Sequence, residues 1–167
     1  MFQFQQYAFE TIKDIQARGK KVILCGGTML WLDAITENYA FSETKGEKST
    51  EKNDQLFESL KVGMYWPRPK LYDRINLRVD LQFDDALKEE VENLYKLYPN
   101  MTKTAETSTG VQEMKAYLDG MCTLDEAKEI NKKRDRNYAK RQLTWWRGRK
   151  DILWCDSSNT GITEGDL

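Results

Sequence analysis

The feature that most constrains the fold is a short apolar run, KKVILCGG at residues 20–27, which ends in two glycines. Such a run is typical of a strand that is buried on both faces of a parallel sheet. An amphipathic helix is predicted before it at 4–18, and a second helix after it at 28–38 with Thr28 as its cap. Helix, buried strand, glycine turn and helix together indicate an α/β fold with parallel strands.

A polar linker is predicted at 42–55, because this stretch contains no large apolar side chain. The alternation of strands and helices continues after it. A second strand is predicted at 60–66 and a last one at 151–156. A polar stretch at 102–110 breaks the helical pattern. The predicted helices cover 70–83, 84–98, 111–120 and a long segment that begins at a Thr123/Glu126 capping box and ends near Arg147.

Composition narrows the class of protein further. A chain of 167 residues with 40% hydrophobic residues fits one domain, here 1–167. Histidine is absent and Cys25, Cys122 and Cys155 lie far apart, which argues against a zinc site or a His-based triad. No apolar run is long enough to span a membrane. The odd cysteine count and the absence of a recognisable signal peptide predict reduced thiols in the cytoplasm.

The long helix concentrates positive charge, although the whole chain has a formal net charge of −1. Residues 128–150 include ten Lys or Arg but only two acids, Glu129 and Asp135. One helical face carries a row of cations, and the other carries apolar groups that can pack against the domain. The cationic row comprises Lys133, Arg136, Lys140, Thr144 and Arg147, flanked by Arg134 and Arg141; the opposite side comprises Leu124, Ala127, Tyr138 and Trp145. Such a row suits an RNA backbone, and the alternative is a solvated lysine-rich face.

Two further features can bind an anion. The CGGT turn at Gly26, Gly27 and Thr28 offers backbone amides at a helix N-terminus, or it is only a tight turn. Arg74 and Arg78, four residues apart on one helix, can clamp phosphate oxygens, or they form surface salt bridges with nearby acids.

Five stretches, in order, resemble tRNA dimethylallyltransferases, the enzymes that prenylate an adenosine beside the anticodon. They are RGKKVILCGGTMLWLDAI, LKVGMYWPRPKLYDRINLRVD, TGVQEMKAYLDG, RNYAKRQLTWWRG and ILWCD. The resemblance covers nearly the whole chain apart from the linker and the tail. It implies transfer of a dimethylallyl group from dimethylallyl diphosphate to the exocyclic amine of the adenosine.

The resemblance also implies site residues. Arg78 would bind the diphosphate, whose charge Mg²⁺ would help to neutralise. Gly26, Gly27 and Thr28 would lie beside the channel where adenine meets the prenyl donor. The tRNA anticodon stem–loop would lie along the long helix, where the expected RNA-binding residues are Lys133, Arg136, Tyr138, Lys140, Arg141, Gln142 and Arg147. Trp145 is expected to pack beneath that helix rather than to stack on a base.

The chain departs from the family pattern at several points. The family's P-loop, its general-base aspartate and its helical insertion have no counterpart here, and the 42–55 linker stands in place of the insertion. We therefore expect an incomplete P-loop NTPase-like sheet and no transfer by the chain alone. Asp135 replaces a threonine of the pattern, and its negative charge should weaken RNA binding.

Three accounts of these departures remain open: a fragment of a longer enzyme, a non-catalytic paralogue that binds RNA or a protein, and an active minimal transferase. A nucleotide kinase on the same core is disfavoured by the missing P-loop. An unpaired sheet edge would favour oligomerisation.

Overall fold

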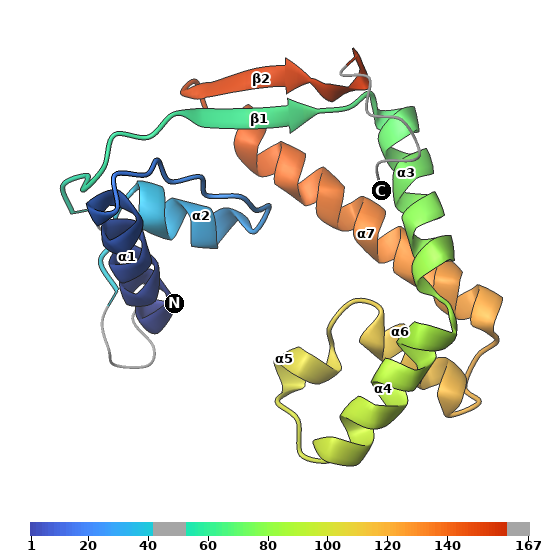
Figure 1. Ribbon diagram of the computed structural model, residues 1–167. Coiled ribbons are helices and arrows are strands. Elements are labelled where there is room, and N and C mark those ends of the chain that lie inside the picture. Colours follow the sequence, from blue (N-terminus) through green and yellow to red (C-terminus); the bar gives the residue numbers. More distant parts are fainter. Residues whose placement is uncertain (42–52, 160–167) are drawn as a thin grey trace. The chain divides into compact units, whose positions relative to one another are not determined.

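A computed structural model describes residues 1–41 and 53–159, which divide into two compact units. Unit 1 is Met1–Gly63 with Thr144–Leu153, and unit 2 is Met64–Leu143 with Trp154–Leu167. The strands β1 (Lys61–Tyr65) and β2 (Ile152–Asp156) pair in parallel as a two-stranded sheet (Figure 1). An α/β architecture with parallel strands is therefore confirmed, while the single domain over 1–167 stays a prediction.

In unit 1, α1 (Phe2–Ala17) packs against α2 (Met29–Thr36). Phe9, Ile12 and Ile35 form the buried contact between these helices. The buried side chain of Gln5 adds a polar tie, because its amide donates to the carbonyl oxygens of Ala34 at 2.6 Å and Tyr39 at 2.9 Å. Both bonds satisfy backbone acceptors near the end of α2, where carbonyls lack helical partners.

Unit 2 contains most of the remaining helices. They are α3 (Arg68–Gln82), α4 (Asp85–Leu97), α5 (Lys103–Glu106), α6 (Val111–Leu118) and most of α7 (Leu124–Arg147). Its core joins side chains from four helices and the residue that ends α3: Val79, Phe83, Val91, Met114 and Ala127. Burying each of the larger of these side chains contributes about 1.5–3 kcal/mol.

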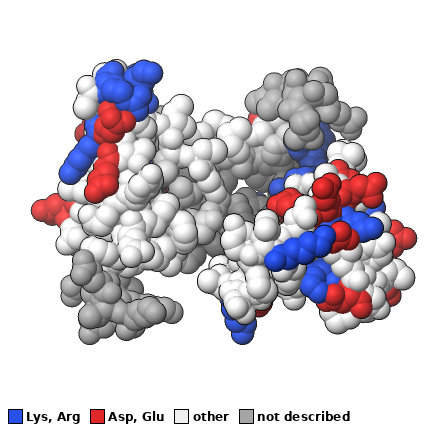
Figure 2. Space-filling view, turned by 60° about the horizontal axis from the view of Figure 1, so that its bottom comes forward, with Lys and Arg blue, Asp and Glu red and all other residues white. Residues whose placement is uncertain are grey.

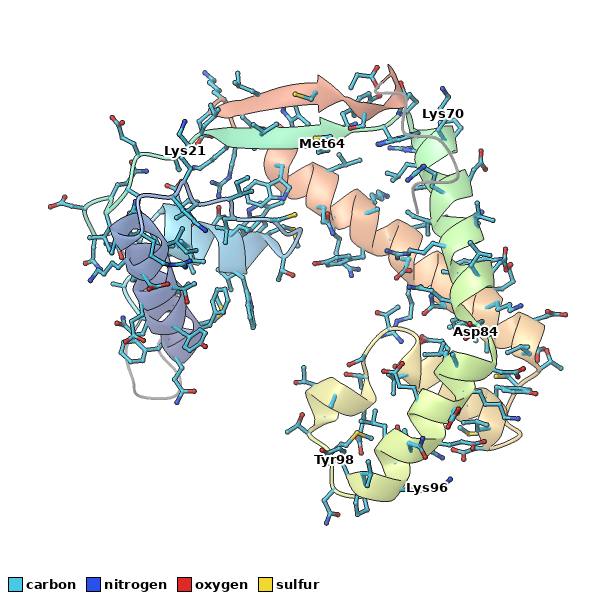
Figure 3. The ribbon with its side chains drawn as sticks, viewed as in Figure 1. Lys21, Met64, Lys70, Asp84, Lys96 and Tyr98 are labelled. Carbon is cyan, nitrogen blue, oxygen red and sulfur yellow. The ribbon has the colours of Figure 1, made fainter. Side chains whose placement is uncertain are left out.

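Local signals explain where the helices of unit 2 begin. Pro67 occupies the N-cap of α3 and Pro69 lies in its first turn, where a missing N–H costs nothing. Asp84 caps α4 by accepting a 2.9 Å hydrogen bond from the backbone N–H of Leu87. Figure 3 shows Asp84 at the point where α3 gives way to α4. The helices predicted over 70–83 and 84–98 are confirmed to within two residues.

The predicted buried strand at 20–27 is wrong. Residues 20–28 have no regular secondary structure, and the side chains of Ile23 and Leu24 are 89% and 43% exposed. An apolar run becomes a buried strand only where neighbouring strands accept its hydrogen bonds and helices cover its side chains. The sheet in the described part of the chain consists of β1 and β2, and neither pairs with this segment.

Two smaller expectations also need correction. The 102–110 stretch contains α5, which begins where the Thr102 hydroxyl accepts a hydrogen bond from the N–H of Ala105. Thr28 is the N-cap residue of α2, but its side chain makes no capping hydrogen bond.

The 42–55 linker falls mostly outside the described residues. No helix in residues 1–41 or 53–159 combines the length and apolar character needed to cross a bilayer.

Candidate functional site

Helix α7 carries most of the residues predicted to bind RNA, and its start follows from the sequence. The Thr123 hydroxyl accepts from the N–H of Glu126 at 3.2 Å, and the Glu126 carboxylate accepts from the N–H of Thr123 at 2.8 Å. This reciprocal pair is the predicted capping box. Hydrogen bonds from the backbone and side chain of Thr123 lower the pKa of Glu126.

The predicted cationic row on α7 is largely exposed. Lys133, Lys140, Arg141 and Arg147 are exposed, while Arg136, Tyr138 and Gln142 are half-buried. Arg141 lies over the ring of Tyr138 at 5.5 Å, so these two predicted RNA ligands also contact each other. On the apolar side Ala127 is fully buried, as expected, and Leu124 packs against the core of unit 2.

Several cations of α7 are paired with groups of unit 2 rather than with solvent alone. Lys132 contacts Asp80 at 2.8 Å and Glu129 at 2.9 Å, and Arg134 pairs with the buried carboxylate of Glu113. Arg136 donates to the neutral amide oxygen of Asn76 at 2.6 Å. The positive charge of the helix is therefore partly neutralised. On the face that Figure 2 shows, side chains of both signs lie close together.

The two arginines of α3 have different neighbours. Arg78 donates from Nη2 to the carboxylate of Asp135 on α7 at 2.7 Å. The Arg78 side chain is 55% exposed, and the Asp135 side chain is 13% exposed. Arg74 lies 4.5 Å from the ring centre of Trp66. The two guanidinium groups thus have separate partners, and the acid that pairs with Arg78 comes from another helix.

A hollow of about 530 Å³ lies beside the Arg78–Asp135 pair, within unit 2. Its wall includes the apolar Phe83 and Leu87 and the amide of Asn131. The charged groups that line it are Arg78, Asp84, Glu90 and Asp135. Three carboxylates against one guanidinium make the hollow acidic, which disfavours an anion there.

The predicted turn at Gly26, Gly27 and Thr28 belongs to unit 1 and comes directly before α2. Gly26 is exposed, and a Cβ placed on it would meet Leu32 at 3.7 Å, an ordinary contact. Its φ also lies outside the left-handed region. Neither close packing nor backbone geometry therefore requires glycine at position 26.

A buried carboxylate in unit 1 was missed by sequence reasoning. Asp33 of α2 has no exposed surface, and its Oδ2 accepts from the indole Nε1 of Trp145 at 2.9 Å and from the guanidinium of Arg149. Burial raises the pKa of Asp33, although the Trp145 hydrogen bond and the charge of Arg149 oppose the shift. Trp145 is 43% exposed, and its N–H binds Asp33 of α2, so the expected packing of this side chain is only partial.

Lys61 at the start of β1 joins the same region of unit 1. Its ammonium group contacts the carboxylates of Glu37 and Asp151, the latter at 2.7 Å. Burial alone would lower the pKa of Lys61, but the hydrogen bonds to these two acids outweigh it and raise the pKa. Arg149 also lies 3.6 Å from Glu37, so acids and bases alternate through the cluster.

Comparisons with known proteins point to one family. A sequence profile described as IPP transferase matches residues 1–61 and 40–149. The tRNA dimethylallyltransferase of Anoxybacillus flavithermus is 32% identical over an alignment of 217 residues, gaps included. The alignment covers 97% of this chain and 70% of that protein. The corresponding protein of Halothermothrix orenii is 40% identical over 112 residues, or 67% of this chain and 34% of its own length.

Solved structures agree. The full-length tRNA isopentenylpyrophosphate transferase of Bacillus halodurans matches with a TM-score of 0.79 and 26% identity, over 92% of this chain and 65% of that one. A similar transferase from Staphylococcus epidermidis matches with a TM-score of 0.78 and 23% identity, over 94% of this chain and 70% of that one, and supports the fold alone. The profile and the Anoxybacillus relative both extend over most of the sequence, and on that evidence the chain belongs to the IPP transferase family.

Proposed function

We propose that this protein acts in tRNA modification, in the transfer of a dimethylallyl group from dimethylallyl diphosphate to an adenosine of the anticodon stem–loop. In that reaction the exocyclic nitrogen bonds to the allylic carbon, the carbon–oxygen bond breaks, and pyrophosphate leaves with its electrons. The amine then gives up a proton. The observation that carries the proposal is an exposed cationic row on α7, in a chain whose relatives are tRNA dimethylallyltransferases.

The anticodon stem–loop is assigned to α7. Exposed cations follow an RNA backbone through its phosphates, and half-buried Tyr138 and Gln142 can position or contact bases. The residues proposed to bind RNA are Lys133, Arg136, Tyr138, Lys140, Arg141, Gln142 and Arg147. Asp135 lies within this segment, and its carboxylate should oppose the phosphates.

Residues for the prenyl donor and the adenine are proposed within each unit separately. Arg78 of unit 2 is proposed to bind the diphosphate, because more than half of its side chain remains exposed beside its contact with Asp135. Gly26, Gly27 and Thr28 of unit 1 are proposed to line the channel for adenine and the prenyl group. No catalytic side chain is assigned.

Mg²⁺ is proposed to arrive with the diphosphate rather than to occupy a site built by the protein. Within residues 1–41 and 53–159, no group of three or more His, Cys, Asp or Glu side chains is placed to hold a metal ion. Mg²⁺ often keeps several waters and binds substrate phosphates with only one or two carboxylates. The ion would neutralise the charge of the leaving pyrophosphate.

The sheet supports two further parts of the proposal. β1 and β2 are proposed to form an incomplete P-loop NTPase-like sheet. Val62, Met64 and Leu153 on these strands are exposed, and Figure 3 marks Met64. Strands with unpaired edges and exposed apolar side chains can pair with another chain, so oligomerisation is proposed. The cytoplasmic location and the inactivity of the chain alone stay predictions.

The test of RNA binding is the double variant Lys140→Glu/Arg141→Glu. Its affinity for an anticodon stem–loop RNA should fall at least tenfold, and the dependence of binding on salt should weaken with the lost phosphate contacts. The matched control is Lys88→Glu/Lys96→Glu on α4, which makes the same change in net charge at two exposed lysines. Equal losses in both variants would show that only net charge matters.

The test of transfer is the mass of the RNA after incubation with the chain, dimethylallyl diphosphate and Mg²⁺. An increase of one dimethylallyl group that Arg78→Ala abolishes supports the full proposal and overturns the prediction that the chain alone is inactive. RNA that binds through Lys140 and Arg141 but keeps its mass would reduce the function to RNA binding.

A further inference from the structure

We propose that Asp135 sets the affinity of this protein for its anionic donor, by competing with the diphosphate for the guanidinium of Arg78. The inference rests on the proposed role of Arg78. It goes beyond that role because it assigns an opposing function to a residue of a different helix. Asp135 would then occupy, in the absence of the donor, the guanidinium group of Arg78 that the diphosphate binds.

The geometry of the pair favours competition. Arg78 donates from Nη2 to Asp135 at 2.7 Å, and carboxylate and phosphate oxygens use the same guanidinium donors. Asp135 is mostly covered, with 13% of its side chain exposed, whereas 55% of the Arg78 side chain is exposed. The arginine is therefore the partner that can turn toward a ligand, while the carboxylate stays in place.

Apart from Arg78, the groups around Asp135 offset its charge only in part. Two nearby cations of α7 already have acidic partners, since Lys132 contacts Asp80 and Arg134 contacts Glu113. The hollow beside Arg78 adds the carboxylates of Asp84 and Glu90. An anion that approaches Arg78 through this hollow meets more negative than positive charge.

Asp135 has two opposing effects on the binding of an anion by Arg78. Their relative sizes decide whether removing its charge strengthens or weakens that binding. A carboxylate can orient a guanidinium toward a ligand, but with 55% of the Arg78 side chain exposed to solvent this ion pair contributes little. A diphosphate carries at least two negative charges, and each is repelled by a carboxylate that shares its arginine. Repulsion should win, so removing the charge while keeping an oxygen acceptor should strengthen binding.

The experiment is calorimetric titration of the full chain with inorganic pyrophosphate and Mg²⁺ at low salt. Asp135→Asn should bind pyrophosphate roughly threefold to tenfold more tightly than the wild type. The matched control is Asp80→Asn, which removes one carboxylate that contacts Lys132 instead of Arg78; its affinity should change less than twofold. If a thermal melt shows that Asp135→Asn folds poorly, Asp135→Thr replaces it, and the same gain in pyrophosphate affinity is expected.

The two proposals fail in different ways. In an Arg78→Ala background, Asp135→Asn should give no gain, because the effect passes through the arginine. If Arg78→Ala weakens binding but Asp135→Asn leaves it unchanged or weaker, Asp135 is not a competitor and the inference is overturned. If pyrophosphate binding is absent, or is the same with and without Arg78, the proposed role of Arg78 fails as well.

Discussion

The indole nitrogen of Trp145 donates a 2.9 Å hydrogen bond to Asp33, a carboxylate with no exposed surface and 112 residues away in the sequence. Arg149 binds the same oxygen, and its guanidinium lies 5.0 Å from the ring centre of Trp146. The other oxygen, Oδ1 of Asp33, is buried without a hydrogen-bond partner in the described structure. The stability of unit 1 therefore depends on how well a few donors compensate one buried charge.

Trp145→Phe should destabilise the protein by about 1.5–3 kcal/mol, because it removes a hydrogen bond to a buried charged group and keeps most of the ring. Urea unfolding followed by circular dichroism would measure the loss. Trp154→Phe on β2 is the matched control, since the Trp154 side chain is exposed and the substitution removes an indole there too. Equal effects of the two variants would show that the Asp33 bond is not responsible.

The raised pKa of Asp33 predicts a pH dependence with a definite sign. Burial raises this pKa above its ordinary value of 3.8, so between 3.8 and the folded value the native state holds the proton more tightly than the unfolded chain. The contribution of Asp33 to stability is present in full below pH 3.8 and is lost as pH rises through the folded pKa.

Asp33→Asn isolates this contribution, because asparagine keeps an oxygen that can accept from Trp145 but does not titrate. The difference in unfolding free energy, wild type minus variant, should decrease as pH rises from about 4 toward 7. A difference that is constant with pH, or that increases, would contradict a raised pKa. Urea unfolding at several pH values measures it.

Helix boundaries were predictable from sequence because the signals are local. The Thr123/Glu126 box that the sequence predicts, the Asp84 cap and the prolines at the start of α3 each act through atoms within a few residues. The family was predictable because its motifs are ordered along the chain.

Long-range relationships were not predictable in this way. The segment 20–28 has the composition of a buried strand, but strand formation depends on partners elsewhere, and Ile23 is exposed. Asp33 looks like one acid on an apolar helix until Trp145 and Arg149 are placed against it. The Arg78–Asp135 pair likewise joins residues 57 apart, although the unusual acid among cations was a usable signal.

Met114 tests the core of unit 2, because its side chain is 1% exposed and lies among Val79, Val91 and Ala127. Met114→Ala should cost about 2–5 kcal/mol through lost burial and the cavity that remains. Met121→Ala offers the matched control, since Met121 is 70% exposed and should change stability by less than about 0.5 kcal/mol. Comparable losses in the two variants would contradict this location of the core.

Gly110 tests the start of α6, and here backbone conformation rather than packing decides. Its φ of 93° lies in the left-handed region, and its N–H donates to the Glu113 carboxylate at 2.9 Å. A Cβ added at this position would meet no atom within 4 Å, so Gly110→Ala should cost about 1–3 kcal/mol through strain alone.

Gly148→Ala is the matched control for that substitution. A Cβ at Gly148 also meets no atom within 4 Å, but its φ lies outside the left-handed region. Alanine there should leave stability within about 0.5 kcal/mol of the wild type. Thermal or urea unfolding of the two variants side by side decides the matter, since identical stabilities would mean that Gly110 does not need its positive φ.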